Sequence, residues 1–124
     1  MDAETSYLRL KEIALTEFPD IVISSSITKG PLNTPKSLRI FLIDNSFLEI
    51  WLSNEKYSYH WQKRDGKIYR HDNAPHPRHK HLKTFPKHFH DGSEEKVKES
   101  NISNNPEQAV REFLAFIREK LKSN

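Results

Sequence analysis

The chain has 124 residues, a length that suits a single hydrophobic core, so we expect residues 1–124 to form one domain. It contains no cysteine, which excludes disulfides, thiolate metal sites and thiol nucleophiles. The formal net charge is +3, no apolar run approaches the roughly 20 residues of a membrane span, and the first residues lack a signal-peptide pattern. We therefore expect a cytoplasmic protein that makes no membrane contact.

A helix is predicted first in the chain, with Thr5 or Ser6 as its N-cap and Pro19 ending the pattern. Apolar residues recur between these positions with helical spacing, which predicts one buried face. They are Tyr7, Leu10, Ala14 and Phe18.

Five short strands are predicted next, from β-branched and aromatic runs or from alternating patterns. They cover residues 21–28, 38–43, 47–52, 57–63 and 67–72. Asp65-Gly66 indicates a two-residue hairpin turn between the last two strands, and the resulting register places His60 opposite His71. A slip of one residue would bring Arg70 beside His60 instead.

Residues 73–92 contain three prolines and are predicted to form an ordered loop with short extended pieces. A second helix is predicted near the C-terminus, where Asn105 can cap it, Pro106 takes its first position and Gln108 can complete a capping box. Its buried stripe is Val110, Phe113, Leu114, Ile117 and Leu121. The expected fold is α+β, with an antiparallel sheet of about five strands flanked by an N-terminal and a C-terminal helix.

All seven histidines lie within residues 60–90, together with eight basic and two acidic residues. This segment therefore has a formal charge of 8 − 2 = +6, and the rest of the chain sums to −3. A local basic surface is typical of a polyanion partner such as RNA. Histidine in addition exchanges protons or binds metals near neutral pH.

Two kinds of chemistry fit this segment. In metal-free RNA cleavage, one histidine removes a proton from the ribose 2′-OH and another protonates the leaving oxygen, while a basic side chain stabilises the phosphate. Alternatively, the H-x-H pairs His79/His81 and His88/His90 could bind a metal, with Asp72, His76 or Asp91 completing the site. A third reading is a non-catalytic module in which the basic loop only binds nucleic acid or a protein.

The strongest candidate residues are those tied to rigid points of the chain. Arg70 and Asp72 lie at a predicted strand end, and His76, His88 and His90 lie close to prolines that limit loop freedom. His79 and His81 fall in a run that reads as an exposed loop. The aromatic residues Tyr57, Tyr59 and Trp61 alternate as on the buried face of a sheet, so most are assigned to the core.

Three blocks of the chain resemble the TumE family of type II toxin–antitoxin toxins: KYSYHWQ at 56–62, RHDNAPH at 70–76 and TFPKHFH at 84–90. The two helices and the hairpin at 38–52 also stand where that family places them. The chain departs at His71, where an aromatic residue is more typical, and at Lys87, where a histidine is. Residues 78–83 look specific to this chain and are not part of the resemblance to the family.

The resemblance implies a small toxin encoded beside a helix-turn-helix antitoxin and related to RelE-like ribonucleases, which cut messenger RNA without an obligatory metal. The leading prediction is thus a metal-independent endoribonuclease with no cofactor and no metal site. His76, His88 and His90 would supply acid and base, and Arg70 and Lys87 would stabilise the phosphate. His60 and Asp72 complete the predicted substrate-binding set.

The expected partners are RNA, including ribosome-associated messenger RNA, and the antitoxin, and a homodimer is left open. A metal-dependent nuclease or hydrolase with a histidine-rich site and a non-catalytic RNA- or protein-binding module are the alternatives.

Overall fold

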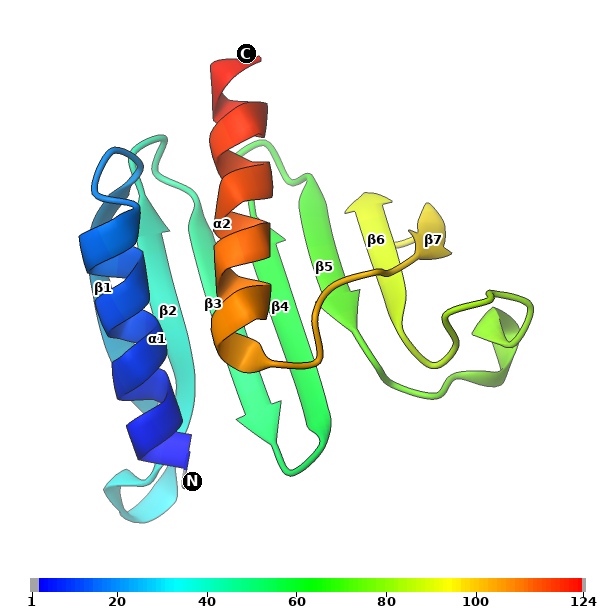
Figure 1. The fold of residues 1–124 in the computed structure, drawn as a ribbon, viewed down its shortest axis with the longest axis horizontal. Helices are drawn as coiled ribbons and strands as arrows, with labels where there is room; N and C mark the ends of the chain where they lie inside the picture. The colour runs from blue at the N-terminus through cyan, green and yellow to red at the C-terminus, as the bar shows by residue number, and fades with distance from the viewer. Residues whose placement is uncertain (1–2, 124) are drawn as a thin grey trace.

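The computed structural model describes residues 3–123, which form a seven-stranded antiparallel sheet with two helices against one face (Figure 1). The strands lie side by side in chain order, so each strand pairs with the next one along the chain. The elements are α1 (Ala3–Glu17), β1 (Val22–Lys29), η1 (Pro31–Asn33), β2 (Pro35–Leu42), β3 (Phe47–Ser53), β4 (Lys56–Gln62), β5 (Ile68–Asp72), η2 (Pro77–His79), β6 (His88–Gly92), β7 (Val97–Glu99) and α2 (Pro106–Lys122).

The prediction of about five strands was wrong, because β6 and β7 extend the sheet beyond β5. Strand β6 lies in the segment that was expected to be an ordered loop with short extended pieces, and no element was predicted where β7 lies. The sequence of β6 lacks an alternating apolar pattern, since histidines occupy the positions on one of its faces. These histidines are nevertheless buried, because they pack against one another and against β5.

The predicted register of the β4–β5 hairpin was also wrong by one residue. The backbone N–H of Lys63 donates to the carbonyl of Lys67 (3.0 Å), which leaves a three-residue loop ending at Gly66. Gly66 has a φ of +93°, as expected for a type I turn followed by a left-handed residue. His60 therefore pairs with Arg70, and His71 pairs with Tyr59.

The helix-covered face of the sheet forms the core. Tyr59 and Trp61 of β4 point into it, as predicted, and the indole N–H of Trp61 donates to the hydroxyl of Ser46 (2.8 Å). The stripes of both helices are buried there. In α2 the Asn105 side chain accepts a hydrogen bond from the backbone N–H of Gln108, which confirms the predicted N-cap. Helix α1 begins at Ala3, ahead of the predicted cap at Thr5 or Ser6.

Within residues 3–123, neither α1 nor α2 covers the opposite face of the sheet, which carries many polar side chains; we call it the open face (Figure 1). The registers align one row of charged and polar residues across five strands: Arg39, Glu49, His60, Arg70 and His90. Within this row, Arg39 and Glu49 form an ion pair of 2.9 Å. Three residues of this row, His60, Arg70 and His90, belong to the histidine-rich segment 60–90.

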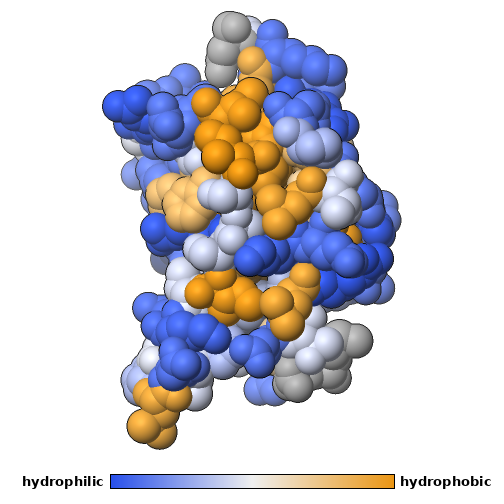
Figure 2. All heavy atoms as spheres, turned by 90° about the vertical axis from the view of Figure 1, so that its left-hand side faces the viewer, coloured by the Kyte–Doolittle hydropathy of each residue, from blue (hydrophilic) through white to orange (hydrophobic). Residues whose placement is uncertain are grey.

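The side of the molecule formed by α1 and the edge strand β1 is more apolar. Leu8, Ile23 and Ile43 are exposed on α1, on β1 and just after β2, and Figure 2 shows apolar side chains gathered over this side. Across residues 3–123, no helix combines the length and the apolar character needed to span a membrane.

Candidate histidine pocket

The antiparallel pairing of β5 with β6 builds the candidate site. It places Arg70 opposite His90, and Asp72 opposite His88. Because side chains alternate along a strand, these four residues all project from the open face, whereas Tyr69, His71 and Phe89 project toward the helices.

A carboxylate lies between the two histidines of β6. The Nε2 atom of His88 lies 3.1 Å from Oδ1 of Asp72, and the Nε2 atom of His90 lies 3.8 Å from Oδ2. The exposed fractions of His88 and His90 are only 1% and 3%. Both imidazoles are therefore removed from bulk solvent and are oriented toward one acid.

The loop after β5 adds a third buried histidine. His79 ends η2, is 5% exposed, and its ring centre lies 4.5 Å from that of His88 and 6.2 Å from that of His90. We call Asp72, His79, His88 and His90 the histidine pocket. His76 lies at the rim of the pocket, where it is exposed and its ring centre is 6.4 Å from that of His88.

Arg70 links the pocket to the polar row. Its Nε–H donates to Asp72 (2.9 Å), and its two Nη atoms donate to both carboxylate oxygens of Glu94 (3.0 and 2.7 Å). The nearest ring nitrogen of His60 lies 3.4 Å from Nη1, and the other hydrogen-bonds with Gln62. The guanidinium is thus held in place, although it keeps some exposure.

Burial lowers the pKa of several of these histidines. It lowers the pKa of His79, with His88 and Arg78 acting in the same direction. It also lowers the pKa of His90, although a hydrogen bond to the Glu94 carbonyl opposes the shift. On the other face, burial lowers the pKa of His71 to about 4, and its ring stacks on Phe89 at 4.2 Å. His71 is therefore a neutral core residue.

The structure brings together six of the seven predicted site residues and leaves one apart. His76, His88, His90, Arg70, His60 and Asp72 lie on or beside the same end of the open face. Lys87 does not join them, because its ammonium group donates to the carbonyl of the core residue Ile102 and contributes to the charge around His71.

The sequence interpretation named His79 only in its alternative metal reading, and it did not name Glu94. His79 was assigned to an exposed loop, but the η2 turn folds it against β6. Glu94 follows β6 and was not singled out, although it anchors Arg70. The sequence offered one signal for His79, because Pro77 at the start of η2 restricts the backbone of this turn. That restriction does not say which way the His79 side chain faces.

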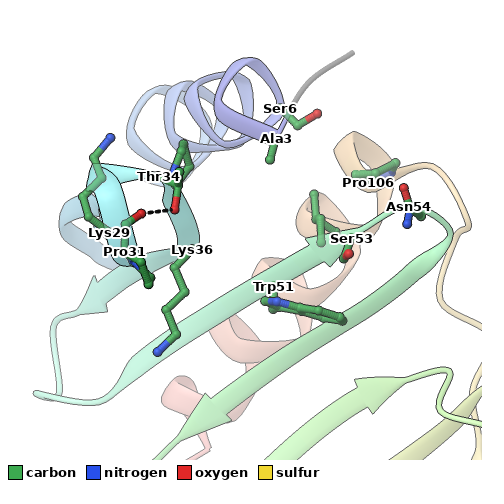
Figure 3. Close-up of a pocket in the computed structure, with 13 residues that line it drawn as sticks. Ala3, Ser6, Lys29, Pro31, Thr34, Lys36, Trp51, Ser53, Asn54 and Pro106 are labelled. Atoms are coloured by element: carbon green, nitrogen blue, oxygen red, sulfur yellow. Dashed lines mark hydrogen bonds between the residues drawn. The ribbon is translucent and has the colours of Figure 1, made fainter.

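A large groove lies elsewhere on the molecule. It has a volume of about 780 Å³ and runs between the start of α1, the β1–β2 connection and the end of β3 (Figure 3). Lys29, Lys36 and Trp51 line it, but none of the predicted site residues does. The histidine cluster and this groove are therefore separate features.

The fold and the site define a class: an α+β domain with a helix-covered core and a histidine–carboxylate pocket beside a fixed arginine on the open sheet face. Such a pocket suits proton transfer or metal binding next to an anionic ligand. The chain matches the family model described as Toxin TumE over residues 10–121, nearly its full length, and it belongs to this toxin family. Searches of curated proteins and of solved structures gave no match.

Proposed function

We propose that this toxin is an endoribonuclease of a type II toxin–antitoxin system and that it cleaves messenger RNA at the histidine pocket. The observation that supports this most directly is the convergence of His88 and His90 on Asp72, beside Arg70 and with His76 at the rim. Membership of a toxin family also implies a cognate antitoxin. We propose that this partner is a helix-turn-helix protein.

The proposed reaction needs no oxidant and no second substrate. The ribose 2′-oxygen attacks the adjacent phosphorus as a base takes its proton, and an acid protonates the 5′-oxygen as the phosphorus–oxygen bond breaks. His76 suits contact with the substrate because it is exposed at the rim. His88 and His90, which both lie against Asp72, supply the complementary proton transfer in this scheme.

Arg70 is the phosphate-binding residue in this proposal. Its planar guanidinium matches the oxygens of a phosphate, and its contacts with Asp72 and Glu94 fix its position before RNA binds. His60 lies beside it on the path of the polar row, which would accommodate the RNA backbone. Lys87 faces away, so we place it outside the phosphate site.

Expression in growing cells tests this function. We expect the wild-type chain to arrest growth and to create new RNA 5′ ends, and we expect His76→Ala and His88→Ala to lose both effects. His81→Ala is the matched control, because His81 is exposed and lies outside the pocket. Growth arrest without new RNA ends would reject the ribonuclease and favour a toxin that acts by binding.

A metal-dependent nuclease or hydrolase is the second candidate, because three ligand atoms from Asp72, His88 and His90 lie within 4.8 Å of one another. Cleavage of RNA by the purified chain, with and without a chelator, separates the two mechanisms. Full activity in the chelator supports histidine acid–base catalysis without a metal, in line with the proposed relation to RelE-like ribonucleases.

A further inference from the structure

The hydrogen bonds of the two β6 histidines determine which ring nitrogen carries the proton. Nδ1 of His88 lies 3.0 Å from the carbonyl of Pro86, and Nδ1 of His90 lies 2.9 Å from the carbonyl of Glu94. A carbonyl oxygen only accepts hydrogen bonds, so each Nδ1 must be the donor. In the neutral imidazoles, each Nε2 therefore presents a lone pair.

Both lone pairs are directed at the carboxylate of Asp72, which also has only lone pairs to offer when ionised. In a buried pocket such an arrangement is unfavourable unless a positive charge lies between the groups. Among residues 3–123, no hydrogen-bond partner is found for the Nε2 atom of His90 or for the Nε2 atom of His79. A proton on His88 would satisfy one contact and leave those two nitrogens unpaired.

The geometry points to a bound divalent transition metal of the zinc class, held by Asp72, His88 and His90, with His79 as the fourth ligand. The three primary ligand atoms already lie within 4.8 Å of one another. Three imidazoles and one carboxylate are a donor set that zinc accepts in a closed tetrahedral site.

The surroundings of the ligands agree with metal binding. Metal-binding histidines commonly donate their second ring N–H to a backbone carbonyl or a carboxylate, and His88 and His90 do so to Pro86 and Glu94. Arg70 donates to Asp72 and would hold the carboxylate in place. The ligands come from β5, η2 and β6, so a metal would also fasten the proline-rich loop to the sheet.

A zinc ion on Nε2 of His88 and His90 would occupy the nitrogens that the proposed acid–base scheme uses, so a filled site would replace that scheme with the metal-dependent one. Zinc binding can be measured without RNA. The full-length chain is stripped with a chelator, which is then removed, and is titrated with zinc in a calorimeter. We expect one zinc per chain and a higher melting temperature. Cobalt in place of zinc should give the strong visible absorption of a four-coordinate site, which reports on the ligands directly.

Near-isosteric changes keep the test interpretable if alanine variants do not fold. We expect Asp72→Asn and His90→Gln to weaken zinc binding by a factor of about ten or more. The far-ultraviolet circular dichroism spectrum should stay unchanged. His79→Gln should alter the cobalt spectrum. His81→Gln is the control, because it removes an exposed histidine of the same loop and should bind zinc like the wild type.

Three results would overturn the metal site: no zinc binding by the folded chain, unchanged affinity in His90→Gln, or affinity that depends on His81. Zinc binding without RNA cleavage would instead reject the proposed function and leave the metal site intact. RNA cleavage by a folded chain that binds no zinc would reject only the metal site.

Discussion

Asp72 and Arg70 occupy adjacent same-face positions of β5, and together they organise the site at the scale of single residues. Asp72 lies against two buried histidines, and Arg70 donates hydrogen bonds to the carboxylates of both Asp72 and Glu94. The guanidinium can make these contacts at once because its donors form a rigid planar fork. A lysine keeps the charge but cannot reproduce this pattern.

We therefore expect Arg70→Lys to lower the free energy of unfolding by about 1–2 kcal/mol and RNA cleavage by about tenfold to a hundredfold. Urea denaturation and cleavage of a labelled RNA are the measurements. Arg64→Lys is the matched control, since Arg64 is exposed in the β4–β5 loop, and it should leave both quantities unchanged. Equal activity of Arg70→Lys and wild type would show that Arg70 contributes only charge.

At the scale of elements, the β4–β5 hairpin decides which residues share the open face. Its loop has one more residue than Asp65-Gly66 predicted, and the extra residue brings Arg70 rather than His71 beside His60. The loop needs a residue with a φ of +93° at position 66, and glycine adopts this left-handed conformation without the strain that a side chain would bring.

Gly66→Ala should lower the free energy of unfolding by about 1 kcal/mol, even though a Cβ there would meet no atom within 4 Å. The strain alone is responsible. Gly30→Ala provides the comparison, because Gly30 has a φ of −103° and its added Cβ would make only ordinary contacts. Urea denaturation of both variants measures the effect, and equal stabilities would argue against the left-handed turn.

Helix α2 depends on its N-cap in the same local way. Asn105→Ala removes the acceptor for the backbone N–H of Gln108 and should cost about 1 kcal/mol in thermal or urea unfolding. The neighbouring exposed Asn104 caps nothing in the described structure, so Asn104→Ala should change stability by less than about 0.5 kcal/mol. A larger effect of Asn104→Ala would move the cap by one residue.

At the scale of the whole molecule, the sheet separates an apolar, helix-covered face from a polar, open one. The two tryptophans report on the two environments. Trp61 is fully buried, stacks on Tyr69 and meets Phe116 of α2, whereas Trp51 is 40% exposed. The same substitution should therefore have different consequences at the two positions.

Trp61→Phe should lower the free energy of unfolding by about 2–3 kcal/mol, because it leaves a cavity and removes the indole hydrogen bond to Ser46. Trp51→Phe should stay within about 0.5 kcal/mol of the wild type. Chemical denaturation followed by circular dichroism measures both. Similar losses in the two variants would mean that the helices do not cover the face assigned to them.

Features set by residues close together in the sequence were predicted well, and features set by contacts between distant segments were not. Helical stripes, the Asn105 cap and the alternating core residues of β4 are set by neighbours a few positions apart, so they were predictable. The strand β6 was not, because its histidines are buried by polar contacts that no hydrophobic pattern announces. His88, His90, Arg70 and Asp72 were all candidate site residues, and the structure places them together. Their contacts with His79 and Glu94 were not predicted.

The sequence by itself determined the α+β class, the concentration of histidine and basic residues in one segment, and the blocks that resemble the TumE family. Tertiary structure decided which of these residues meet. A one-residue difference in a hairpin loop chose the partner of His60, and the path of a proline-rich loop buried His79 while Lys87 turned toward the core. Local periodicity is written in short stretches of sequence, whereas these contacts depend on register and packing between distant segments.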